Sequence, residues 1–179
     1  MIPTRFVQPE VVTSHFYLRP GDAVADLGAG SGYFLQNLVD GVTETGTVYA
    51  CEIQRPLVEK LGELVRREGW SNVQSLWCDL EEAGGVPLAD NAVDVAILIN
   101  TLFQFDNKAS AIQEACRIIR PGGKLYIVDW SESYQGMGPT ADMLVSEQAA
   151  TDLGEANGFS LETTYPAGDH HYGLAFRKQ

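Results

Sequence analysis

The stretch VADLGAGSGYF, residues 24–34, constrains the fold of this chain more than any other segment. Its first residues are apolar and are typical of the end of a buried strand, and an apolar spacing typical of a helix starts at Tyr33. Gly28, Gly30 and Gly32 lie between the two elements, which indicates a tight strand-to-helix turn. Such a turn presents backbone N–H groups at a helix start and can bind a ligand, although glycine-rich turns also occur for structural reasons alone.

Short apolar runs and amphipathic segments alternate along the rest of the chain. Strands are predicted over 23–27, 46–53, 72–79, 92–100 and 124–130. Helices are predicted from Pro9 to about Leu18, from Tyr33 to about Val39, over 56–69, from about Asn107 to the RPGG turn at 120–123, and from Ser146 to about Asn157. The run AVDVAILIN is mostly apolar, as a central parallel strand buried on both faces requires. This order predicts a parallel sheet with helices on both faces.

No helical pattern separates the last two apolar stretches, FSLETTYPAG at 159–168 and HHYGLAFRKQ at 170–179. Two strands that are joined directly form an antiparallel hairpin, which adds a reversed strand to the sheet. We therefore expect an α/β fold whose doubly wound, seven-stranded sheet is mostly parallel and ends in an antiparallel hairpin. A chain of 179 residues suffices for one hydrophobic core, which predicts a single domain over 1–179.

Acidic residues outnumber basic ones by 24 to 12, which gives a formal net charge of −12. Repulsion of phosphates at long range argues against nucleic acid and anionic membranes as partners. The sequence has no run of about 18 apolar residues, and its start, MIPTRFVQPE, lacks the apolar core of a signal peptide. These features predict a cytoplasmic protein without membrane insertion. They do not indicate whether the protein is a monomer or an oligomer.

Three cysteines, Cys51, Cys78 and Cys116, lie within apolar stretches rather than at the close spacings of metal sites. We therefore expect buried free thiols and no metal site. Because Cys51 and Cys78 each precede an acidic residue at a predicted strand end, these two are expected to be neighbours in space.

Acidic residues lie at the ends of the first three predicted strands, where an open α/β sheet binds its ligand. Asp26 precedes the glycine turn, and Glu52 ends the second strand, where its carboxylate can accept hydrogen bonds from ribose hydroxyls. Asp79 ends the third strand and can accept from an adenine amine, with a backbone N–H from Leu80 and an apolar face from Ile53. Each acid alone could be a solvated loop residue, but the three together predict a nucleotide-like ligand.

At these positions the sequence resembles the class I S-adenosylmethionine-dependent methyltransferases, and among them the small type 11, ubiquinone-biosynthesis-like group. The resemblance lies in DLGAGSG, ACEI, CDLEE, DVAILINTLFQF and EACRIIRPGGKLYIVDW, and in the reversed terminal strand. It implies S-adenosylmethionine as the cofactor and S-adenosylhomocysteine as its product. It also implies that Asp26 and the three glycines surround the methionine portion, Glu52 the ribose, and Asp79 with Leu80 the adenine.

Methyl transfer requires the acceptor, the methyl group and the sulfur to be aligned, and no dedicated catalytic side chain is obligatory. We expect Asn100 and Trp130 to position the reacting groups because they follow the fourth and fifth strands, and Asn100 also to contact the cofactor. Gln104 and Asp129 are further candidates at the same strand ends. The alternatives are a strand-end cap for Asn100, a solvated loop for Gln104, and a lid or core packing for Trp130.

Several other candidates also have a structural alternative. Tyr33 can cover the methionine portion of the cofactor or pack within its helix. One of His170 and His171, at the hairpin turn, can act as a base, and the alternative for both is a surface or packing role. In the resembled family the first helix can close over the cofactor, so residues 1–18 are a predicted lid, and core packing is the alternative role of His15.

The expected methyl acceptor is a small, apolar or neutral molecule. Apolar side chains near the expected methyl position can exclude water from a compact acceptor: Leu102, Phe103, Phe105, Trp130 and Met137. Phosphate binding normally needs several cations on one face, and no basic run in the chain is longer than Arg66–Arg67. The same apolar residues could instead complete the core.

Two alternatives from other classes stay open. A nicotinamide-dependent oxidoreductase shares the acidic residue after the second strand, but its dinucleotide motif needs a glycine where this chain has Tyr33. A non-catalytic module that binds S-adenosylmethionine or S-adenosylhomocysteine and signals through a partner would use the same cofactor site. A comparison of the affinities for S-adenosylhomocysteine and for NAD distinguishes a methyltransferase from the first alternative. Only an assay of methyl transfer distinguishes it from the second.

Overall fold

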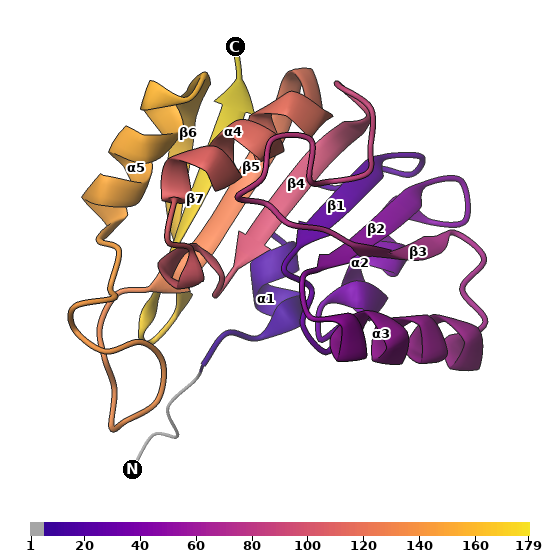
Figure 1. The fold of residues 1–179 in the computed structure, drawn as a ribbon, viewed down its shortest axis with the longest axis horizontal. Helices are drawn as coiled ribbons and strands as arrows, with labels where there is room; N and C mark the ends of the chain where they lie inside the picture. The colour runs from indigo at the N-terminus through magenta and orange to yellow at the C-terminus, as the bar shows by residue number, and fades with distance from the viewer. Residues whose placement is uncertain (1–5) are drawn as a thin grey trace.

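The computed structural model describes residues 6–179, which build one seven-stranded sheet with the strand order β3-β2-β1-β4-β5-β7-β6 (Figure 1). The elements in chain order are α1 (Pro9–Thr13), β1 (Ala23–Leu27), α2 (Leu35–Val42), β2 (Thr47–Glu52), α3 (Arg55–Glu68), β3 (Val73–Trp77), β4 (Val93–Ile99), the 3₁₀ helix η1 (Leu102–Gln104), α4 (Lys108–Ile118), β5 (Ile119–Trp130), α5 (Glu147–Ala156), β6 (Phe159–Gly168) and β7 (His171–Lys178). Strands β1 to β5 are parallel, and β7 pairs antiparallel with both β5 and β6. The predicted fold class is confirmed.

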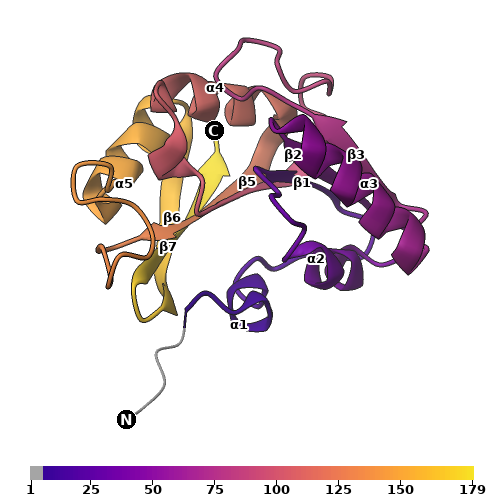
Figure 2. The same ribbon diagram turned by 60° about the horizontal axis from the view of Figure 1, so that its bottom comes forward.

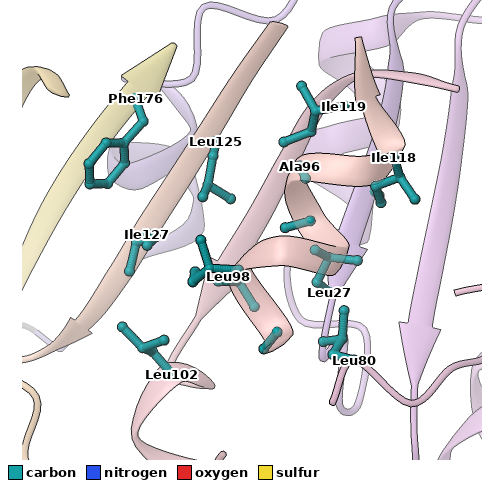
Figure 3. Close-up of a cluster of buried hydrophobic side chains, with 14 of the residues drawn as sticks. Leu27, Leu80, Ala96, Leu98, Leu102, Ile118, Ile119, Leu125, Ile127 and Phe176 are labelled. Carbon is teal, nitrogen blue, oxygen red and sulfur yellow. The ribbon is translucent and has the colours of Figure 1, made fainter. Parts of the chain in front are cut away.

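The sheet is covered on both faces, and Figure 2 shows α4 and α5 on one side and α1 and α2 on the other. Side chains alternate across a strand, so β4 serves both cores. Ala96 and Leu98 pack in the cluster under α4 and α5 (Figure 3), whereas Val95, Ile97 and Ile99 pack in the cluster that includes residues of α1, α2 and α3. This double burial explains why the run at 92–100 is apolar without the alternation of a half-exposed strand.

Several predicted element ends are wrong by a few residues. The first helix stops at Thr13 rather than about Leu18, but Phe16 beyond it is fully buried and its ring lies 4.7 Å from that of Tyr126. Helix α2 starts at Leu35 because the glycine turn continues through the preceding residues. Strand β5 starts at Ile119, and the RPGG segment bulges out between two stretches paired with β4.

Predicted caps and cysteine positions agree with the structure for the most part. The Ser146 hydroxyl accepts a hydrogen bond from the Ala149 N–H and caps α5, as predicted. Cys51 and Cys78 are buried neighbours, and their mutual hydrogen bond, followed by burial, raises the pKa of the Cys51 thiol. The expectation of full burial is wrong for Cys116, which is half-buried on α4. No helix within residues 6–179 is long and apolar enough to cross a membrane.

A buried ion pair ties the loop after β3 to α4. The Glu114 carboxylate is 3% exposed and accepts hydrogen bonds from the N–H groups of Gly84 and Val86, at 3.1 and 2.9 Å. The Arg117 guanidinium lies 2.7 Å from the same carboxylate and also donates to the carbonyl of Val86. One side chain therefore satisfies two backbone donors and a cation.

We expect the Glu114→Ala substitution to lower the free energy of unfolding by about 3 kcal/mol, because it leaves two backbone N–H groups without their acceptor and removes the buried carboxylate that pairs with Arg117. Urea denaturation measures the change. Glu155→Ala, at an exposed position of α5, removes the same charge and is expected to change stability by less than about 0.5 kcal/mol. Equal losses in the two variants would show that the buried pair contributes little.

Candidate functional site

A cavity of about 470 Å³ opens at the carboxyl ends of β1, β2 and β4, next to the chain that follows β3. Its size suits a ligand such as a nucleoside derivative. Of the residues predicted to bind the cofactor, nine line this cavity: Asp26, Gly28, Gly30, Tyr33, Glu52, Ile53, Asp79, Leu80 and Asn100. Gly32 does not line it. The cavity thus brings together side chains from four strand ends that are distant in the sequence.

The three glycines of the turn differ in what surrounds them, although all have positive φ angles of 88°, 54° and 83°. A Cβ atom at Gly28 would lie 2.6 Å from the Thr101 side chain, and one at Gly32 would lie 2.8 Å from Leu64. A Cβ atom at Gly30 would meet no atom within 4 Å. Packing within the chain therefore disfavours a side chain at Gly28 and Gly32, whereas Gly30 leaves open space on the wall of the cavity.

Glu52 connects the glycine turn to the end of β2. Its side chain is almost fully buried, and one carboxylate oxygen accepts a hydrogen bond from the Gly30 N–H at 3.0 Å. The other oxygen accepts from the Gln54 N–H at 2.9 Å. Each carboxylate oxygen can accept more than one hydrogen bond, so Glu52 can hold the turn in place and still accept from hydroxyl groups of a ligand.

Asp26 lies at the base of the cavity and is 3% exposed. Burial, and to a lesser extent the Glu52 carboxylate, raise the pKa of Asp26 from 3.8 to about 7. The carboxyl group therefore keeps its proton to a much higher pH in the folded, ligand-free protein than in the unfolded chain. A cationic group bound beside it would favour the ionised form and release the proton.

The raised pKa of Asp26 has a consequence for stability. The unfolded chain loses this proton near pH 3.8 and the folded chain only near pH 7, so the buried carboxyl group lowers the free energy of unfolding progressively between these values. We expect Asp26→Asn to increase the free energy of unfolding of the ligand-free protein, by about 2 kcal/mol more at pH 8 than at pH 5.

Urea denaturation at the two pH values tests this prediction. Asp106→Asn is the matched control, because Asp106 is exposed and its removal is expected to change stability alike at both pH values. A gain for Asp26→Asn that is the same at pH 5 and pH 8 would contradict the raised pKa.

The far end of the cavity is formed by the chain after β2 and β3. Asp79 is half-buried, and its carboxylate accepts a hydrogen bond from the Glu81 N–H at 3.0 Å. Ile53 is 51% exposed although it is apolar, and Leu80 beside Asp79 is buried. The structure thus combines an exposed apolar side chain with a carboxylate, which suits a flat ring with an exocyclic amine.

Asn100 follows β4 and lines the wall of the cavity. Its backbone has a φ of 55°, its N–H donates to the Val128 carbonyl at 2.8 Å, and its carbonyl accepts from the Gln104 side chain at 2.7 Å. Its side-chain oxygen is buried and has no hydrogen-bond partner among residues 6–179. An unpartnered buried polar atom costs about 1–3 kcal/mol, so this oxygen is a candidate ligand contact rather than a backbone cap.

A second cavity of about 300 Å³ shares Tyr33, Phe34 and Asn100 with the first. Its other lining residues are Phe6, Val7, Trp130, Met137 and His171. Phe6 and Val7 belong to the predicted lid segment 1–18, and Phe34 follows Tyr33, but none of the three was predicted individually as a site residue, because no local pattern shows which apolar side chain faces a cavity. Asn100 stands at the junction of the two cavities.

Several other candidates lie elsewhere than expected. Asp129 is buried and lines neither cavity, and its carboxylate accepts from the N–H groups of Phe103 and Trp130, so it supports η1 and the end of β5. Burial raises the pKa of Asp129 to about 6. Leu102 is fully buried in the core and Phe103 packs against it, so only Phe105, Trp130 and Met137 of the predicted apolar set line a cavity.

The predicted lid and the histidines are partly described by the structure. Residues 1–5 of the lid lie outside the described residues, and α1 with its flanks packs against the sheet. His170 and His171 are both buried at the β6–β7 turn, so the surface role is wrong for them. The His15 ring stacks on that of Tyr165 at 4.4 Å, which agrees with packing.

Comparison with known proteins gives the family. Residues 18–163 match the model of a methyltransferase domain family, Methyltransf_31. A ubiquinone/menaquinone biosynthesis C-methyltransferase from Chromobacterium violaceum is 29% identical over 136 residues, which are 73% of this chain and 54% of that protein. The chain therefore spans about half the length of this curated relative.

Solved structures share the fold over nearly the whole chain. A SAM-dependent methyltransferase from Aquifex aeolicus superposes with a TM-score of 0.89 at 28% identity, covering 97% of this chain and 91% of that one. The [4+2]-cyclase SpnF superposes with a TM-score of 0.80 at 17% identity, covering 95% and 79%. At that identity the likeness concerns the fold alone. With the family match, the relatives and the cavity together, the chain belongs to the methyltransferase domain family as a class I S-adenosylmethionine-dependent methyltransferase of the type 11, ubiquinone-biosynthesis-like group.

Proposed function

We propose that this chain transfers a methyl group from S-adenosylmethionine to a small molecule held in the second cavity. The observation that carries the proposal is Asn100, which is half-buried, lines both cavities, and has a buried side-chain oxygen without a partner among the described residues. A residue at this junction can contact the cofactor and the acceptor at once. Such a contact fixes the two reactants relative to each other, which is the main requirement of a displacement at carbon.

The residues of the first cavity fit S-adenosylmethionine. The buried carboxyl group of Asp26 suits an ammonium group, and the open space at Gly30 allows a ligand to approach the backbone closely. Glu52 has lone pairs free for ribose hydroxyls, and Asp79 with the exposed Ile53 suits an adenine ring. The bound cofactor would supply a methyl group activated by a positively charged sulfur.

The chain's own residues would align the reactants and exclude water. Phe34 and Tyr33 separate the glycine turn from the second cavity, and Trp130 forms a wall of that cavity beside His171. Aromatic faces near the junction can stabilise positive charge. This arrangement holds a compact acceptor in line with the methyl group, and the proposal requires no general base.

A small acceptor is favoured over a macromolecule by size and charge. The second cavity, at about 300 Å³, fits a compact molecule. The net charge of −12 opposes the approach of RNA. The C-methyltransferase relative is named for the biosynthesis of small molecules, ubiquinone and menaquinone, which supports the same class of acceptor.

A second candidate is a protein that binds the cofactor without transferring its methyl group. The [4+2]-cyclase SpnF has the same fold but is named for a different reaction. The fold alone therefore does not imply methyl transfer. The nicotinamide alternative lacks such support, since the family match is to a methyltransferase domain.

Incubation with methyl-labelled S-adenosylmethionine and cell extract, separated into small-molecule, protein and RNA fractions, tests the proposal. We expect label in the small-molecule fraction, and its loss with Asn100→Ala. Gln148→Ala, an exposed amide on α5, is the matched control and should label normally. Label only in RNA or protein would overturn the small-molecule acceptor, and no label in any fraction would favour the non-catalytic candidate.

A further inference from the structure

The turn between β6 and β7 carries two adjacent histidines with different surroundings. The Nδ1 atom of His170 lies 2.8 Å from the Glu132 carboxylate and pairs with it, whereas its Nε2 atom is buried without a partner among residues 6–179. His171 lines the second cavity, is 6% exposed, and both of its ring nitrogens are buried without a hydrogen-bond partner among residues 6–179. A buried polar group without a partner is unfavourable, so the cavity lacks a group that pairs with this ring.

The His171 ring is neutral at physiological pH. Burial, followed by the neighbouring His170, lowers the pKa of His171 to about 4. A neutral imidazole has one nitrogen that donates a hydrogen bond and one that accepts. The ring can therefore pair with a hydroxyl or N–H group of a ligand without requiring the ligand to carry charge.

The rest of the wall favours a flat, neutral ligand. The Trp130 ring lies 4.2 Å from the His171 ring, and the Phe6 ring lies 6.1 Å from that of Trp130. Phe34 and Tyr33 line both this cavity and the cofactor cavity. No charged side chain lines this cavity within the described part of the chain, so an ionic ligand would be desolvated without compensation.

We propose that His171 is the specificity-determining residue of the second cavity, and that it selects a neutral, flat acceptor bearing a hydroxyl or N–H group that pairs with its ring. The inference rests on the proposed function for the position of the acceptor. It adds a residue whose contribution is independent of cofactor binding, because His171 does not line the cofactor cavity.

Indole and 1-methylindole form a suitable pair of probes, because they have the same flat shape and differ in the N–H group. Each is titrated into the protein saturated with S-adenosylhomocysteine, and affinity is measured by calorimetry. We expect indole to bind about tenfold more tightly, a ratio that corresponds to one hydrogen bond. In His171→Phe the ratio should fall below about twofold, whereas His15→Phe, which alters a ring outside both cavities, should leave it unchanged.

The ring signals of the three histidines, observed by NMR in the unaltered protein, provide a second readout that does not depend on the folding of a variant. Indole should shift the His171 signal and leave the His15 signal in place. Equal affinities for the two probes, no binding of either at millimolar concentration, or an unshifted His171 signal would overturn the inference. Failure of S-adenosylhomocysteine to bind in the first step would instead count against the proposed function.

Discussion

Gly30→Val is expected to abolish detectable binding of S-adenosylhomocysteine while the protein stays folded. A Cβ atom at this position meets nothing within 4 Å in the free protein, and the residue lines the cavity proposed to bind the cofactor. The branched side chain would thus occupy space that the ligand needs. We expect an affinity loss of at least about a thousandfold, or about 4 kcal/mol.

Backbone strain must be separated from this steric effect, because Gly30 has a φ of 54° and valine is disfavoured there. Gly69→Val provides the matched control: Gly69 ends α3 with a φ of 71°, also has nothing within 4 Å of its Cβ position, and lies outside the cavity. Both variants should lose about 1–2 kcal/mol of stability. Calorimetric titration should show normal binding for the control, and normal binding for Gly30→Val would show that the turn has only a structural purpose.

Glu52→Ala is expected to weaken binding of S-adenosylhomocysteine by about a hundredfold, or about 2.7 kcal/mol. The substitution removes the acceptor for ligand hydroxyls and also the hydrogen bond to the Gly30 N–H that holds the turn. The two losses act on the same ligand, so the effect should exceed that of one hydrogen bond. Glu52→Gln keeps one acceptor oxygen and should weaken binding less.

Glu59→Ala controls for the change in net charge, because Glu59 is an exposed residue of α3. Its affinity for S-adenosylhomocysteine should match that of the unaltered protein in the same titration. If Glu52→Ala also binds within about twofold, the assignment of this carboxylate to the ribose is wrong.

The sheet could be predicted from the sequence because each step rests on local pattern. The apolar run that ends at Asn100 can be buried on both faces only in a central strand, and the absence of a helical pattern between 159–168 and 170–179 leaves no parallel crossover for the last strand. The ends of elements were predicted less well. Helix α1 stops at Thr13 because the chain must turn to bury Phe16 against Tyr126, a contact that no local pattern encodes.

Some features of the candidate site could likewise be predicted from the sequence, and others could not. Asp26, Glu52 and Asp79 could be predicted, because strand order alone places the carboxyl ends of parallel strands along one edge. The separate reasons for the glycines could not, since Thr101 and Leu64 approach Gly28 and Gly32 from other elements. The burial of His171 could not be predicted, because it depends on Trp130 from β5.

Calorimetric titration of the unaltered protein with S-adenosylhomocysteine, and separately with NAD, tests the central claim most directly. The cavity at the ends of β1, β2 and β4 should bind one S-adenosylhomocysteine per chain and show no heat with NAD. Binding should also stabilise the fold, by about 2.7 kcal/mol at a ligand concentration one hundred times the dissociation constant. No binding of S-adenosylhomocysteine at saturating concentration, or binding of NAD in its place, would contradict the assignment of this cavity to S-adenosylmethionine.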